Sequence, residues 1–180
     1  MSERFGSSSL RDLPKLRDFK RRRWSSWDRT GANEDYIKIE KEKTATIADI
    51  GGSGCVTHLW VTVACDAKHF LRKILFRTFW DGETDPSVEV PIGDFFGIGH
   101  AICKNFVSLP LTMSPQSGRG FNCFFPMPFS NGAKFEIANE SETDIKAFYY
   151  YVDYELHPQP TESLGRFHAQ WRRQNPCDGV

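Results

Sequence analysis

The chain has 180 residues, enough for one domain with a sizeable core. Its 23 Lys and Arg balance 23 Asp and Glu, and the formal net charge of zero excludes a globally basic nucleic-acid binder and a strongly acidic tail protein. Hydrophobic residues make up an ordinary 39%, but the aromatic content of 14% is high and favours β-strands or stacking sites.

The N-terminal segment is first polar and then amphipathic. Residues 1–9 are rich in serine and predict a disordered lead-in. Residues 10–23 repeat Leu or Phe every three positions between basic residues, which predicts a short amphipathic helix. The run Lys20-Arg21-Arg22-Arg23 closes it. This run is compatible with a phosphate or nucleic-acid contact, but cations at the C-terminal end of a solvated helix are the simpler interpretation.

The apolar period then changes from three to two, which is typical of strands. Alternating or β-branched and aromatic runs lie at 37–39, 59–65, 72–80, 104–113, 121–129, 134–138 and 145–156. Turn residues separate them at 51–54, 81–82, 117–120 and 131–132. About eight strands at this spacing predict an all-β, antiparallel jelly-roll sandwich over residues 24–156.

The C-terminal segment, residues 157–180, follows a proline-rich break. Phe167 and Trp171 would be unusual in a free tail. This segment predicts a linker and the start of a second, missing jelly roll.

The cysteines and the hydropathy of the chain indicate the cellular compartment. The five cysteines form no C-x-x-C pair, and most lie in apolar runs, which predicts buried free thiols. No segment resembles a secretory signal or a membrane helix. The sequence therefore predicts a cytoplasmic protein without a membrane partner, a metal or another cofactor.

Two polar segments are candidate sites. Residues 25–36 place Asp28 and Arg29 between two aromatic residues, a pattern that suits a polyol ligand but also a solvated loop. Residues 80–97 hold five carboxylates, of which Asp81, Glu83 and Asp85 alternate without the glycine and distal glutamate of a calcium loop. A glycosidic carboxylate pair would need a separation of about 5–9 Å, which spacing alone leaves open.

Four longer segments together resemble a known family. They stand in family order and span most of the chain: RRRWSSWDRTGANEDY, FWDGETDPSVEVPIGDFFG, FPMPFSNGAKFEIANE and GRFHAQWRRQNP. The chain resembles the domain of unknown function 2961 family, part of which is classed as glycoside hydrolase family 172.

The resemblance implies a fold, an assembly and a chemistry. Family members have two successive jelly rolls, form trimers or hexamers, and hydrolyse α-furanosides with retention through two glutamates. This chain resembles the first jelly roll and the opening of the second. The family's glutamates stand in Trp-Trp-Gly-Glu and Gly-Thr-Glu-Asp-Tyr stretches, which do not occur here. No catalytic residue is therefore expected in this chain.

The resemblance also implies substrate-contact residues in the two polar segments. These are Trp27, Asp28, Arg29, Thr30, Asn33 and Asp35 in the first, and Trp80, Asp81, Glu83, Asp94, Phe95 and Phe96 in the second. The expected ligand is a furanoside, and the expected assembly is a homo-oligomer, a trimer or a multiple of three.

Three hypotheses about function follow. The chain is the N-terminal part of a furanosidase, or a non-catalytic jelly roll that self-assembles or binds carbohydrate, or an adaptor that binds nucleic acid through its basic run. The reading frame beyond Val180 distinguishes the first two. A steep salt dependence of binding would identify the third.

Overall fold

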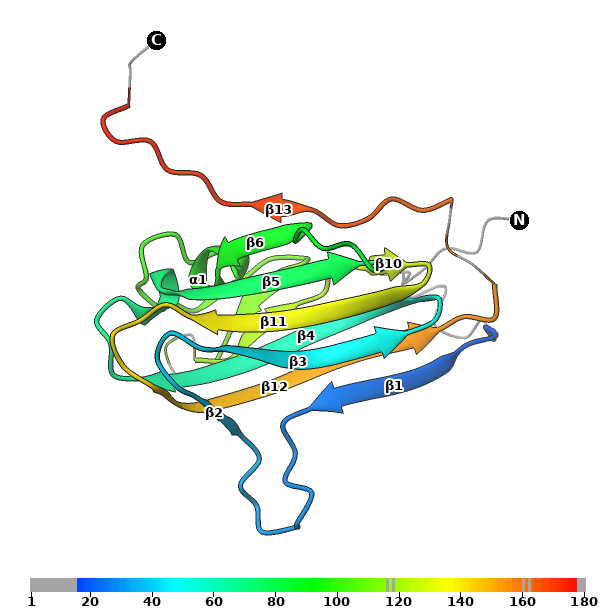
Figure 1. Ribbon diagram of the computed structural model, residues 1–180, viewed down its shortest axis with the longest axis horizontal. Coiled ribbons are helices and arrows are strands. Elements are labelled where there is room, and N and C mark those ends of the chain that lie inside the picture. The colour runs from blue at the N-terminus through cyan, green and yellow to red at the C-terminus, as the bar shows by residue number, and fades with distance from the viewer. Residues whose placement is uncertain (1–15, 116, 118, 160, 162, 178–180) are drawn as a thin grey trace.

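The computed structural model describes residues 16–115, 117, 119–159, 161 and 163–177. Two β-sheets face each other, and the connections between strands lie around their rims (Figure 1). The predicted all-β sandwich is confirmed. The described helices are one turn of α-helix, α1 (Ile92–Phe95), and a short 3-10 turn, η2 (Phe70–Arg72).

The larger sheet has eight strands in the order β1-β12-β4-β9-β8-β7, with β2 also paired to β12 and β10 to β4. The central strands β4 and β12 pair along almost their whole length, because both are long runs of β-branched and aromatic residues. The strands are β1 (Lys20–Ser25), β2 (Ile37–Ile39), β4 (Gly54–Cys65), β7 (Phe106–Val107), β8 (Leu111–Met113), β9 (Phe121–Cys123), β10 (Met127–Phe129) and β12 (Ile145–Leu156).

The smaller sheet has five strands in the order β13-β6-β5-β11-β3. Its strands are β3 (Thr44–Gly51), β5 (Ile74–Trp80), β6 (Val88–Pro91), β11 (Gly132–Asn139) and β13 (Ala169–Gln170). Four of them pair antiparallel, but β13 pairs parallel to β6, so this sheet is mixed.

The core lies between the sheets and is unusually aromatic. Phe76 packs against Phe95 and Phe135, with ring centroids 4.5 and 6.0 Å apart, and Trp80 meets Phe135 edge to face. Among the described aromatic residues, Trp27, Phe124 and Tyr151 are the exposed ones. A single sandwich therefore buries most of the aromatic excess, and that excess by itself is no reason to expect an oligomer.

The expected helix over residues 10–23 is wrong where the structure describes it. Residues 16–19 have no regular structure, and Lys20–Ser25 is strand β1. β1 pairs with β12, and two bidentate ion pairs, Arg17 with Glu155 and Arg23 with Asp153, anchor this segment. These partners lie more than 100 residues away in the chain, so the local period of three could not report them.

The C-terminal segment packs on this sandwich. Trp80 Nε1 donates a hydrogen bond to the carbonyl of Phe167 at 2.7 Å, and Phe167 packs against Phe95 and Phe125. β13 extends the smaller sheet, and the chain then runs away from the body (Figure 1). The expected second jelly roll stays a prediction.

The prediction of free thiols is confirmed, but the prediction that they are buried holds for only two of the five cysteines, because Cys65 and Cys103 are partly exposed and Cys177 is exposed. All five are free, and Cys55 and Cys123 are buried. Burial raises the pKa of both thiols to about 12, so they stay protonated and are poor nucleophiles. Within the described ranges, neither helix is long and apolar enough to cross a membrane.

Candidate functional site

The first predicted segment forms a loop, residues 26–36, which we call the polar loop. It connects β1 to β2, and both strands pair with β12, so the loop leaves the larger sheet beside the middle of that strand. It projects away from the body of the sandwich (Figure 1). Ser26 anchors the loop: its Oγ donates to the carbonyl of Asp35 at 2.7 Å and accepts from the backbone N–H of Tyr150 at 3.0 Å.

Asp28 organises the inside of the polar loop. One carboxylate oxygen accepts hydrogen bonds from the hydroxyl and the backbone N–H of Thr30, and the other accepts from the backbone of Glu34. The Asp28 backbone N–H donates to the carboxylate of Asp35. These hydrogen bonds, the one from the Thr30 hydroxyl first, lower the pKa of Asp28. The carboxylate is thus an ionised structural group within an Asx-type turn.

The outer surface of the polar loop presents an aromatic ring and a cation. Trp27 is 54% exposed, and the guanidinium of Arg29 lies 5.3 Å from the centre of its ring. Asn33 is exposed at the loop tip and has the left-handed φ of 67°, which asparagine tolerates. Among the described residues, none accepts a hydrogen bond from the Arg29 guanidinium, so the loop can stack its aromatic ring on a ligand ring and donate hydrogen bonds to the ligand's hydroxyls.

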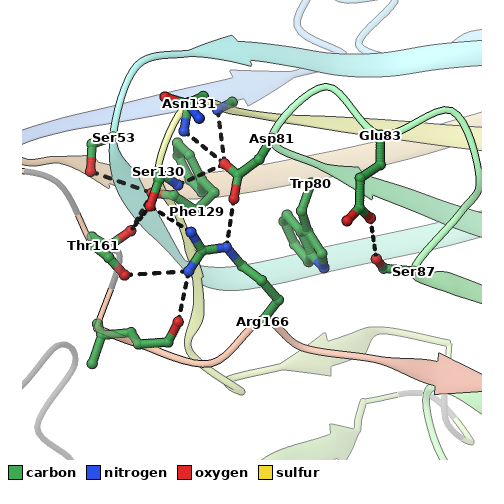
Figure 2. A network of polar contacts seen from close by, with 12 residues as sticks. Ser53, Trp80, Asp81, Glu83, Ser87, Phe129, Ser130, Asn131, Thr161 and Arg166 are labelled. Atoms are coloured by element: carbon green, nitrogen blue, oxygen red, sulfur yellow. Dashed lines mark hydrogen bonds and ion pairs between the residues drawn. The ribbon is translucent and has the colours of Figure 1, made fainter.

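Asp81 lies in a different network, at the end of β5 (Figure 2). Its Oδ1 accepts from the backbone N–H groups of Ser130 and Asn131, both at 2.7 Å, and of Gly132 at 3.3 Å. Its Oδ2 accepts from Arg166 Nε at 2.6 Å. Burial raises the pKa of Asp81, but the hydrogen bonds outweigh it, so the net shift is downward.

Arg166 is the residue that completes this network. It donates to Ser130 Oγ and to the carbonyls of Thr161 and Leu164, and so holds the C-terminal segment against the β10–β11 turn (Figure 2). Thr161 adds a 2.6 Å hydrogen bond to the carbonyl of Phe129. Asp81 therefore serves as a clamp between three chain segments.

The neighbours of Asp81 are mostly structural as well. Trp80 is 1% exposed and belongs to the core. Glu83 is exposed and accepts a hydrogen bond from Ser87 Oγ at 3.0 Å, which closes the turn between β5 and β6 (Figure 2). Among the described residues, no group of His, Cys, Asp and Glu is arranged to hold a metal ion.

The remaining candidates lie at the other end of β5. Asp94 on α1 faces Arg72, the last residue of η2, with Oδ2 2.8 Å from Nε. Burial raises the pKa of Asp94, and the nearby Arg72 only partly opposes this. Phe95 and Phe96 are core residues, 8% and 1% exposed.

The predicted residues therefore lie in three places. The polar loop starts from the larger sheet, whereas Trp80, Asp81 and Glu83 lie at one end of β5 and the α1 residues at its other end. A hollow of about 300 Å³ is lined by none of them but by Glu42, Lys43, Thr44, Arg77, Ala138, Asn139 and Glu140.

Sequence reasoning did not single out Arg72 or Arg166. Both are arginines whose carboxylate partners, Asp94 and Asp81, were themselves candidates. The sequence shows an acidic segment and two arginines outside it. Their spacing along the chain does not predict which arginine pairs with which carboxylate.

A family model described as the GH172 first beta-sandwich domain matches residues 17–174. The chain belongs to this family. The match covers the polar loop, the Asp81 network and β13, so all three are parts of a GH172 first β-sandwich. Comparison with curated proteins gives no match. The membership confirms the family resemblance and identifies a module of the glycoside hydrolase type.

Proposed function

We propose that this GH172 first β-sandwich is a non-catalytic part of an α-furanosidase-type assembly, and that its polar loop contributes to a furanoside pocket. The observation that supports this most directly is the pairing of an exposed Trp27 with Arg29 on a loop held by Ser26 and Asp28. Such a rigid aromatic and cationic surface loses little conformational entropy when a sugar binds.

The ionisation of the carboxylates argues against catalysis by this chain alone. Retaining hydrolysis needs a nucleophilic carboxylate and a carboxylic acid that protonates the leaving group. Asp28 and Asp81 have lowered pKa values and are held by hydrogen bonds, so neither suits the role of general acid. Asp94 has a raised pKa, but its carboxylate is already paired with Arg72 and is not free to protonate a substrate.

The remaining predicted contacts have a supporting role in this proposal. Buried Trp80, Phe95 and Phe96 set the positions of their loops, whereas the exposed residues of the polar loop contact the sugar. A sugar bound by one exposed loop is held weakly, at about millimolar Kd or −4 kcal/mol.

The test combines an activity assay with a binding titration. The chain is expected to show no turnover of p-nitrophenyl α-arabinofuranoside, yet to broaden or shift ligand NMR signals of arabinofuranosides. Trp27→Ala should abolish those changes, and Leu16→Ala, which alters a fully exposed apolar residue outside the polar loop, should preserve them. Turnover that is lost in Asp81→Asn would place catalysis in this chain. Binding that is absent in the wild type would leave only a structural, self-assembling module.

A further inference from the structure

The outer face of the larger sheet bears an ordered set of side chains that the polar loop does not include. Residues on β12 alternate: Val152 and Tyr150 point into the core, so Tyr151 and Asp153 point outward. The same alternation on the neighbouring strands leads to two rows across the sheet, which we call the face grid. The first row is Ser25, Tyr151, Trp60, Asn122 and Thr112, and the second is Arg23, Asp153, His58 and Phe124.

The second row is a continuous polar chain on what would ordinarily be a hydrated surface. Arg23 donates two hydrogen bonds to Asp153, at 2.7 and 2.8 Å. His58 Nδ1 lies 3.2 Å from Asp153 Oδ2, and its Nε2 lies 3.1 Å from Asn122 Oδ1. Asp153 is only 3% exposed although it faces outward. The neighbouring side chains thus cover this carboxylate and fix one another.

Aromatic rings lie beside this polar chain and at its end. Tyr151 and Trp60 stack with their ring centroids 4.8 Å apart, and Arg23 lies over the Tyr151 ring at 4.2 Å. Phe124 stacks on His58 with 9° between the ring planes. Tyr151 and Phe124 remain 36% and 46% exposed. The rings are immobilised before any ligand arrives, which lowers the entropy cost of binding.

Two hydrogen-bond donors of the face grid are unused. Within the described part of the chain, the indole N–H of Trp60 and the amide NH₂ of Asn122 have no acceptor, although both residues are partly shielded. The charges of Arg23 and Asp153 cancel through their ion pair. A ligand for this face is therefore uncharged, rich in hydrogen-bond acceptors and able to lie against aromatic rings.

We propose that the face grid is a second binding surface, and that its ligand is a neutral saccharide chain. A sugar ring offers a C–H face to the exposed ring of Phe124 and contacts the exposed edge of Tyr151, whose ring lies between Trp60 and Arg23, and its hydroxyls accept from Trp60 and Asn122. A peptide strand is disfavoured because β12 and β4 are central strands whose backbone groups are already paired, so no further strand can be added. The proposal does not depend on the function of the polar loop.

Affinity electrophoresis tests it, with the 180-residue chain run through gels that contain arabinan, inulin or xyloglucan. At least one polysaccharide should retard the wild type. Phe124→Ala should weaken retardation by about tenfold, the value of one stacking contact, and Tyr151→Ala, which removes the ring that orders Trp60 and Arg23, should weaken it as well. Trp60→Phe, which keeps an aromatic ring but removes the N–H, should also weaken it. Trp27→Ala should leave the retardation by xyloglucan, a polymer of pyranoses, unchanged, because the polar loop is proposed to bind furanosides.

Three outcomes would overturn the proposal. The first is no retardation by any of the three polysaccharides. The second is retardation that Tyr151→Ala and Trp60→Phe leave intact but Trp27→Ala removes, which would assign all binding to the polar loop. The third is a wild-type oligomer that Tyr151→Lys dissociates, which would make this face a contact between copies of the chain.

Discussion

Asp81 is a residue whose charge holds distant parts of the fold together. We expect Asp81→Asn to lower the free energy of unfolding by about 2–3 kcal/mol, because the charge that Arg166 and three backbone N–H groups contact is removed. Asparagine tolerates the left-handed φ of 57° at this position, so the backbone stays unstrained. Urea unfolding of the two proteins measures the difference.

The control for this residue is Glu83→Gln, two positions away. Glu83 is exposed and accepts only from Ser87 among the described residues, so its substitution should cost less than about 0.5 kcal/mol. Equal losses for both variants would contradict the clamp.

The charge of Asp81 also predicts a pH dependence. Its pKa is lower in the folded state, so its stabilising effect is complete above the unfolded-state pKa and is lost as pH falls through the folded-state pKa. The stability difference between wild type and Asp81→Asn should therefore be constant near neutral pH and shrink below about pH 4. Thermal unfolding across this range measures it, and a difference that does not change with pH would contradict it.

At the scale of elements, the ion pair of Arg23 with Asp153 helps to hold β1 on β12. Arg23→Met leaves the 3% exposed Asp153 with His58 alone, so we expect a loss of about 2 kcal/mol and faster amide exchange along β1 and the polar loop that follows it. Arg21→Met is the matched control, because Arg21 is exposed on the same strand. Equal protection in the two variants would mean that backbone pairing alone holds β1.

The pairing of β4 with β12 depends on a close backbone approach at Gly54. A Cβ added there would lie 2.2 Å from the carbonyl oxygen of Glu155. The two strands would have to move apart to make room, because the clash is with backbone and not with a flexible side chain. Gly54→Ala should therefore destabilise the fold by more than about 2 kcal/mol. Gly51→Ala, whose Cβ would meet no atom within 4 Å, should be close to neutral. Urea unfolding of both variants measures the difference, and similar unfolding midpoints for the two would contradict this explanation.

At the scale of the whole molecule, the exposed apolar residues bear on the oligomeric state. The described surface exposes Ile102, Val107 and Leu109 by 59%, 82% and 83%, and the last two lie in or beside the β7 edge strand. Exposed apolar groups at a sheet edge favour contact with another chain. We expect a trimer or a multiple of three in native mass spectrometry, which Val107→Asp with Leu109→Asp converts to monomer.

A control keeps that experiment specific. Leu16 is fully exposed near the other edge of the same sheet, so Leu16→Asp should leave the assembly unchanged. A wild-type monomer at micromolar concentration would remove the assembly from the proposed function.

The amino-acid sequence by itself determined the fold class and the family. The period-two runs at 59–65, 72–80, 134–138 and 145–156 all contain observed strands, because alternation of apolar residues is a local property of a strand with one buried face. The turn at Asp81-Gly82 is likewise local, because both residues have a positive φ, which few residue types accept. The family motifs are long enough to be recognised without coordinates.

The tertiary structure alone decided the contacts and the burial of each candidate residue. Arg17 and Arg23 sit in a pattern that locally favours a helix, but ion pairs to β12 place them along an extended segment. Asp81 and Asp94 belong to one acidic segment, yet they lie at opposite ends of β5. They therefore pair with different arginines, and their pKa values shift in opposite directions. Burial and electrostatic partnership depend on contacts between residues far apart in the chain, and such contacts exist only once the sheets have paired.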